Sequence, residues 1–252
     1  MNLSLLNSCS DLNVTIENKL MVIQIDRIQK RNALTSEMYT AMNEALMVAD
    51  TNNEVSVVLF KGVDGCFTAG NDLADFLEGD FNENSPVVVF LKTLVHFSKP
   101  VVAAISGAAV GIGTTMLMHC DLVYADQTAK FSMPFSKLGL CAEGASSLLI
   151  PMSVGYHKAA EWLLLGETFY ADEALRAGVI NEVVVSDVAD YAKQKALKLA
   201  GLPPAGVLAT RQLMKRALLN SVDDCINQEI SHFSRLLDSD DAKKAFQAFL
   251  NK

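Results

Sequence analysis

The sequence lacks the cysteine pairs that cross-link secreted proteins or hold zinc. Its five cysteines are scattered, odd in number and never arranged as C-x-x-C, so neither a disulfide framework nor a zinc site is predicted. The four histidines are equally dispersed, and we expect no metal ion. Scattered reduced thiols, an N-terminus without a secretory signal and an ending "FLNK" without the peroxisomal S-K-L signal favour a cytoplasmic protein.

Basic charge is also scarce. Lysine and arginine number 21 against 29 aspartates and glutamates, a net charge of −8, which argues against general binding of nucleic acid or anionic membranes. The longest uncharged run, over 101–118, is broken by three glycines, Ser106 and paired threonines. It therefore predicts a buried strand, turn and helix, and no membrane span.

What the sequence does contain is an alternation of apolar strands and amphipathic helices. The 252 residues, half of them hydrophobic, can form one large α/β domain. Apolar patterns predict a hairpin over 14–25, a helix from Thr35 or Ser36, a short helix over 73–77, a helix over 86–97 and strands in "VSVVLFKG", "PVVAAIS", "DLVYA" and "AKFSM". Strands separated by helices indicate βαβ units and a mainly parallel sheet.

Beyond Pro151 the pattern becomes mostly helical, with one strand expected over 182–185. The segment "GLPPAG" at 201–206 stops one helix and starts the next, and three helices should complete the chain. We expect a core over 1–200 and a helical region over 201–252 within one unit.

Two glycine loops follow predicted strands. Gly107, Gly111 and Gly113 precede a helix, but their spacing fits neither G-x-G-x-x-G nor a phosphate-binding loop. They can place backbone N–H groups at a helix start, where an oxyanion is stabilised, although tight packing alone also explains them. The loop in "GCFTAGNDL" is compatible with an ordinary turn, yet loops at strand ends of one sheet converge on a ligand crevice.

Four segments together resemble the crotonase, or enoyl-CoA hydratase/isomerase, superfamily: "KRNALTSEM", "GCFTAGNDL", "ISGAAVGIGTTMLMHCDLVYAD" and "AKFSMPFSKLGLCAEGASS". With "GLPPA" and the terminal "KKAFQAFLNK", the resemblance covers nearly all of the chain from Val14. It implies an α/β spiral of ββα units with a C-terminal helical trimerisation region, assembled as a trimer or a dimer of trimers. It also implies an acyl-CoA thioester substrate and no cofactor, because coenzyme A is carried as part of the substrate.

The resemblance assigns further residues to the binding site. Backbone N–H groups of Asn71 and Ile112 would form the oxyanion hole. The coenzyme A and substrate positions would be Lys30, Arg31, Ala33, Leu34, Thr68, Ala69, Gly70, Asn71, Asp72, Leu73, Gly111 and Phe135, with Phe249 and Lys252 reaching coenzyme A bound in a neighbouring subunit.

The sequence departs from the family pattern at the positions that determine which reaction is catalysed. Hydratases of the family use two glutamates, and the matching positions here hold Thr115 and Phe135, which cannot exchange protons near neutral pH. Glu143, in "PFSKLGLCAEG", matches the single glutamate of the Δ3-Δ2-enoyl-CoA isomerase branch, and its apolar neighbours should raise its pKa. The sequence thus predicts an isomerase acting in fatty acid β-oxidation, with Glu143 as its acid and base.

Several alternatives stay open at this stage. Glu143 is also compatible with a solvated loop carboxylate, with an enoyl-CoA hydratase or acyl-CoA hydrolase that uses it to activate water, and with a non-catalytic acyl-CoA-binding protein. Residues 86–97 are expected to form one wall of the acyl pocket, whose chain-length preference the sequence leaves open.

Overall fold

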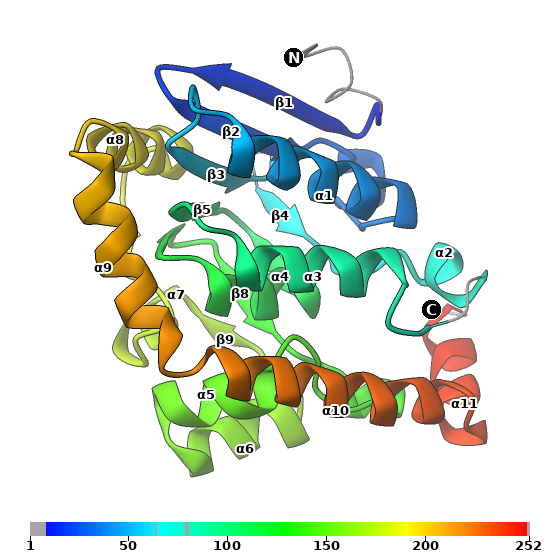
Figure 1. Cartoon of the computed structure of the whole chain (residues 1–252). Coiled ribbons are helices and arrows are strands. Elements are labelled where there is room, and N and C mark those ends of the chain that lie inside the picture. The colour runs from blue at the N-terminus through cyan, green and yellow to red at the C-terminus, as the bar shows by residue number, and fades with distance from the viewer. Residues whose placement is uncertain (1–8, 64, 79–80, 251–252) are drawn as a thin grey trace.

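The chain forms a mixed α/β structure built around two sheets. Its computed structural model describes residues 9–63, 65–78 and 81–250 (Figure 1). The larger sheet has the order β1-β2-β3-β5-β7-β10. Its strands are β1 (Leu12–Glu17), β2 (Leu20–Ile25), β3 (Val57–Lys61), β5 (Val101–Ile105), β7 (Leu122–Asp126) and β10 (Glu182–Val184). Only the β1–β2 pair is antiparallel within it, which confirms the predicted hairpin and the mainly parallel sheet.

A second, smaller sheet was only partly predicted. It has the order β4-β6-β8-β9 and consists of β4 (Cys66–Thr68), β6 (Ala108–Val110), β8 (Lys130–Ser132) and β9 (Phe169–Tyr170). The sequence predicts β8, but β4 and β6 lie inside the glycine loops and are too short to show an alternating pattern. Each of β3, β5 and β7 is followed by one strand of the smaller sheet, which is the ββα repeat that the resemblance implies.

The helices of the first half are α1 (Ser36–Thr51), α2 (Leu73–Glu78), α3 (Pro86–His96) and α4 (Ile112–Thr115), with 3₁₀ turns η2 (Ile28–Lys30), η3 (Met116–His119) and η4 (Ser136–Leu138). Helix α1 begins where predicted, because the Thr35 hydroxyl accepts from the Met38 amide at 3.3 Å and caps its N-terminus. Its end is closed by Lys99, whose Nζ donates to the carbonyls of Ala49, Asn52 and Val55 at 2.5–2.9 Å.

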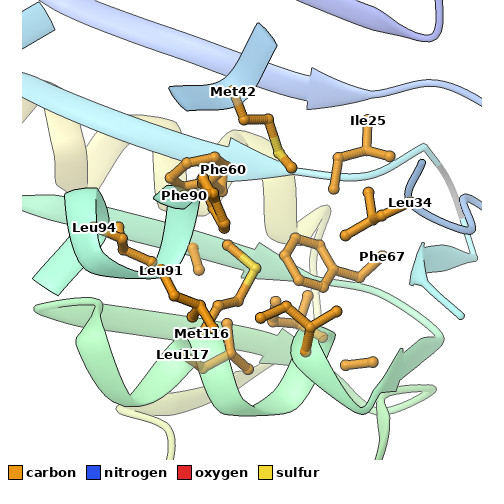
Figure 2. Packing of buried hydrophobic residues seen from close by; sticks show 14 of the residues in the cluster. Ile25, Leu34, Met42, Phe60, Phe67, Phe90, Leu91, Leu94, Met116 and Leu117 are labelled. Carbon is orange, nitrogen blue, oxygen red and sulfur yellow. The ribbon is translucent and has the colours of Figure 1, made fainter. Parts of the chain in front are cut away.

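The main hydrophobic core lies between the sheets and helices α1, α3 and α4 (Figure 2). Phe60 of β3 and Phe90 of α3 meet edge to face, with ring centroids 6.2 Å apart, and Phe67 of β4 is fully buried beside them. Truncating such a ring to alanine costs roughly 3–5 kcal/mol of stability. This core fixes the positions of the loops that follow β4 and β6.

The second half is helical, as expected. It contains α5 (Ser146–Val154), α6 (Tyr156–Leu164), α7 (Ala171–Arg176), α8 (Val188–Ala200), α9 (Pro204–Arg216), α10 (Leu219–Leu237) and α11 (Asp240–Leu250). Three helices, α9 to α11, complete the chain as predicted, and α9 begins at Pro204 within the 201–206 segment. Among the helices of the described residues, none is long and apolar enough to span a lipid bilayer.

The last helices stay attached to the core. Arg211 of α9 donates to the Asp121 carboxylate at 2.8 Å and to the Phe97 carbonyl at 2.5 Å. Helix α10 then runs beside α5 in the half of the molecule opposite β1 (Figure 1). It thereby reaches the loop that contains Glu143.

Candidate active site

The turn after β2 and the loop after β4 are joined by backbone hydrogen bonds. Ala69 donates to the Arg31 carbonyl at 3.0 Å, Leu34 to the Gly70 carbonyl at 2.8 Å, and Asp72 to the Leu34 carbonyl at 2.8 Å. The two segments that the resemblance assigns to coenzyme A therefore lie side by side, although they are some 35 residues apart in the sequence.

Buried Asn32 holds this pair of loops in place. Its Nδ2 donates to the carbonyls of Cys66 and Phe67 at 2.9 and 3.2 Å, and its Oδ1 accepts from the Arg27 amide at 2.7 Å. These bonds stabilise the left-handed backbone of Arg31 and Asn32, at φ of 52° and 55°. Sequence reasoning did not select Asn32, although an asparagine in a turn is a local signal for such a role.

Arg27 is a second residue that the sequence analysis missed. Its Nη1 lies 2.7 Å from Oδ2 of Asp72, and both side chains are mostly buried. Although burial alone would raise it, the hydrogen bonds and charge of Arg27 lower the pKa of Asp72 below its usual value. The Asp72 carboxylate is thus engaged within the protein, and a contact with coenzyme A would fall to its backbone.

The two glycine loops place backbone amides close together. Gly70 has φ of +90° and Gly111 has φ of +56°, and a Cβ on Gly70 would lie 2.8 Å from the Val110 carbonyl oxygen. The next residues, Asn71 and Ile112, do not donate their amide hydrogens to any acceptor in the described part of the chain. Two unpaired amides on neighbouring loops suit a developing oxyanion.

Glu143 and Asn71 line the same pocket. The Thr115 hydroxyl donates to Oε1 of Glu143, and Glu143 lines a pocket with about 360 Å³ of empty space, including space open to solvent. Burial raises the pKa of Glu143, the Thr115 hydrogen bond lowers it and the nearby charge of Glu229 raises it, and the net pKa is about 8. A carboxyl group in this state can give or take a proton near neutral pH.

The pocket around Glu143 is otherwise almost entirely apolar. Its lining residues are Asn71, Phe81, Val87, Val88, Leu91, Glu143, Gly144, Ile226, Glu229, Ile230 and Phe233, so α3 forms one wall, as expected, and α10 forms the other. A second pocket of about 400 Å³ shares Asn71, Phe81 and Val87 with it and extends past Tyr39 and Phe76. Together they form a cleft that suits an acyl chain.

The loop that carries Glu143 is fixed from two sides. His119 donates from Nε2 to the Gly144 carbonyl at 2.8 Å, and burial lowers its pKa to about 4, which keeps the ring neutral. On the other side, the Glu229 carboxylate accepts from the Ala145 amide at 2.6 Å and from the Ser147 amide and hydroxyl at 3.0 and 2.6 Å. Sequence reasoning missed Glu229, because its partners lie more than 80 residues away.

The remaining predicted residues are more dispersed. Lys30 and Arg31 are exposed, which leaves them accessible to phosphate groups. Phe135 is buried beside Gly111 and contacts Phe233 edge to face, with ring centroids 6.5 Å apart. Phe249 belongs to helix α11, far along the chain from the glycine loops, and Lys252 lies outside the described residues.

Metal ligands do not gather anywhere in the part of the chain that the structure describes. No group of three or more histidine, cysteine, aspartate or glutamate side chains is placed to hold an ion there. Burial raises the pKa of Cys120 to about 12, so it stays a thiol.

The comparisons agree with the fold and identify the family. Residues 15–252 match the family model described as enoyl-CoA hydratase/isomerase, and the chain belongs to this family. The structure of Pseudomonas aeruginosa OdaA superposes with a TM-score of 0.95 and 41% sequence identity, covering 97% of this chain and 100% of OdaA.

The curated relatives carry different activities in their names. Enoyl-CoA delta isomerase 2 of Rattus norvegicus is 36% identical over 81% of this chain, which spans only 54% of the rat protein. The 2,3-dehydroadipyl-CoA hydratase of Escherichia coli K12 is 30% identical over 96% of both chains. The family is therefore established as an enzyme family, while the choice between isomerase and hydratase depends on the chemistry of the site.

Proposed function

We propose that the protein is a Δ3-Δ2-enoyl-CoA isomerase in which Glu143 moves the proton. The observation that carries this proposal is the difference between the hydrogen bonds that the two carboxylates of the pocket accept. Glu143 faces the cleft and accepts from one protein hydroxyl, whereas Glu229 accepts from three donors of the protein. One carboxylate is thus available to react with a substrate.

The chemistry of a 3-enoyl thioester needs one such group. Its C2 protons lie between a carbonyl and an alkene, so removal of one by the Glu143 carboxylate leaves a dienolate with charge on the thioester oxygen and on C4. The Asn71 and Ile112 amides would stabilise that oxygen. The protonated Glu143 then returns the same proton to C4, which moves the double bond to C2–C3 and restores the carboxylate.

The positions of Thr115 and Phe135 support isomerisation over hydration. Thr115 gives its hydroxyl hydrogen to Glu143, and Phe135 fills its position with an apolar ring packed against Phe233. Neither supplies a second carboxylate to hold and activate a water molecule. No cofactor or metal takes part in the proposed step.

Exposed apolar side chains support the proposal of a homotrimer or a dimer of trimers. Four large apolar side chains around α5 and α6 are 57–73% exposed: Met152 of α5, Tyr156 and Leu164 of α6, and Leu165 directly after α6. Such exposure is typical of surfaces that are buried on association. A cytoplasmic location and a role in fatty acid β-oxidation remain parts of the same proposal.

The test is to incubate the purified protein separately with 3-hexenoyl-CoA and trans-2-hexenoyl-CoA and to identify the products by mass spectrometry and chromatography. An isomerase converts the first into trans-2-hexenoyl-CoA without adding water. Formation of 3-hydroxyhexanoyl-CoA would identify a hydratase, release of free coenzyme A would identify a hydrolase, and binding without turnover would identify a non-catalytic protein. Each of these last three results contradicts the proposal.

A further inference from the structure

Glu229 is a buried carboxylate in the wall of the proposed acyl pocket, and the proposed proton transfer does not use it. Its side chain belongs to a residue that is 6% exposed, and it lines the pocket together with Glu143. It takes part in no ion pair among the described residues. A charge in such a place is costly unless hydrogen bonds compensate for it.

The compensation comes from the start of helix α5. Glu229 accepts from the Ala145 amide and from the amide and hydroxyl of Ser147, and the helix N-terminus adds a favourable dipole. These three bonds use both carboxylate oxygens and point the group at α5. The carboxylate is therefore fixed in the wall and cannot turn away when a ligand enters.

Among the described residues, none that lines the cleft carries a positive charge to balance it. The residues that line the two pockets include Glu143, Glu229 and Asp75 and no lysine, arginine or histidine. Asp75 is bonded to the amide and hydroxyl of Ser36 at 2.8 and 2.9 Å. Near pH 7 Glu143 is largely protonated, because its pKa is raised to about 8, mainly by burial, and Glu229 is the carboxylate whose charge acts on it.

We propose that Glu229 is a specificity-determining residue: its fixed charge lets the pocket accept acyl chains without charge and makes it reject chains that carry a carboxylate. This inference rests on the proposed function, because it takes the cleft to be the acyl site. A carboxylate on the chain would lose its water and face a like charge without a cation. The substrate class is therefore the CoA thioesters of uncharged alkenoic acids.

The experiment compares two saturated ligands of equal chain length, hexanoyl-CoA and adipoyl-CoA, by isothermal titration calorimetry at pH 7. We expect the wild-type protein to bind hexanoyl-CoA at least about tenfold more tightly. Glu229→Gln should reduce this ratio by about fivefold or more. Asp223→Asn removes one negative charge from the exposed side of the same helix, where Asp223 pairs with His96 at 2.9 Å, and should leave the ratio unchanged.

A second variant keeps the test valid if Glu229→Gln loosens α5. Ile230→Lys places a cation in the same wall, from a partly exposed position, and should also shift the ratio toward adipoyl-CoA. A ratio near one in the wild type, or the same ratio in all four proteins, would show that Glu229 only caps α5 and would overturn the inference.

Neither ligand contains a double bond, so the binding ratio does not depend on isomerisation. A protein that discriminates between the ligands but fails to isomerise 3-hexenoyl-CoA would contradict the proposed function and keep this inference. An active isomerase that binds the two ligands with equal affinity would support the proposed function and contradict this inference. Failure to bind either ligand would contradict both.

Discussion

The hydroxyl of Thr115 donates to the carboxylate of Glu143, from the end of α4 to a loop 28 residues further along the chain. Thr115→Val removes this donor, so the pKa of Glu143 should rise and the acid limb of the kcat/KM profile should move to higher pH. With a hydrogen bond to a charged group contributing about 1.5–3 kcal/mol, activity at pH 7 should fall by roughly 10- to 100-fold. Thr115→Ser keeps a hydroxyl and should retain most activity; equal profiles for the Val and Ser variants would contradict this role.

Glu143→Gln tests the proposed base directly. Gln keeps an oxygen that accepts from Thr115 but cannot remove a proton, so turnover of 3-hexenoyl-CoA should fall by at least ~10²–10⁴-fold while hexanoyl-CoA binding changes little. Steady-state kinetics measure the turnover, and calorimetry on the same preparation measures the affinity for hexanoyl-CoA. Glu44→Gln, on the exposed side of α1, provides a matched control that should behave as the wild type. Normal turnover in Glu143→Gln would exclude Glu143 as the base.

The wild-type enzyme should become more active as the pH rises toward 8. The carboxylate form of Glu143 removes the proton, and its pKa is raised to about 8, so kcat/KM for 3-hexenoyl-CoA should increase up to that pH and then level off. A series of initial rates at saturating and subsaturating substrate measures this limb. A profile already flat from about pH 5 upward would mean that Glu143 ionises as an ordinary carboxyl group.

The same residue should make the fold less stable in alkali. The unfolded chain loses this proton near 4.5 and the native protein near 8, so the unfolded state binds fewer protons between these values and the free energy of unfolding decreases as the pH rises through that window. Glu143→Gln removes this dependence and should be more stable than the wild type at pH 9, by up to a few kcal/mol. Urea denaturation at pH 5 and pH 9 provides the comparison, and an unchanged difference at the two pH values would contradict it.

Gly70→Ala should impair the oxyanion hole. The residue has φ of +90°, and an added Cβ would lie 2.8 Å from the Val110 carbonyl oxygen, so the loop must shift and carry the Asn71 amide with it. Loss of one such donor lowers kcat by about 10²–10³-fold. Gly155→Ala is the matched control, because it has φ of +82° but open space around the new Cβ. Equal kcat for both variants would show that the Asn71 amide does not bind the thioester oxygen.

The sequence predicts the elements whose patterns are local and long enough to repeat. The apolar residues of α1 recur every three or four positions, and all seven of its buried residues lie on that face, while β1 and β2 are adjacent in the chain and pair in register. Strands β4 and β6 have three residues each, too few for any period, and they form only because the glycine loops bring them together. For this reason the sequence predicts only part of the smaller sheet.

The residues of the candidate site likewise fall into those with a local sequence signal and those without one. Glu143 and the two glycine loops stand in recognisable segments, so their roles could be predicted before the structure was known. Asn32, Arg27 and Glu229 act through partners distant in the chain, and a glutamate within an amphipathic helix resembles any solvated residue. Only the folded arrangement shows that Glu229 faces Ala145 and Ser147.

Helix α10 provides one wall of the cleft and, through Glu229, fixes the first turn of α5. A protein truncated after residue 200 would therefore lose more than a surface for association. The cleft would lose one wall and open to water, and the loop that carries Glu143 would lose the hydrogen bonds from Glu229 that fix it. Proteolytic nicking within 201–206 should, for this reason, end catalysis even where the sheets survive.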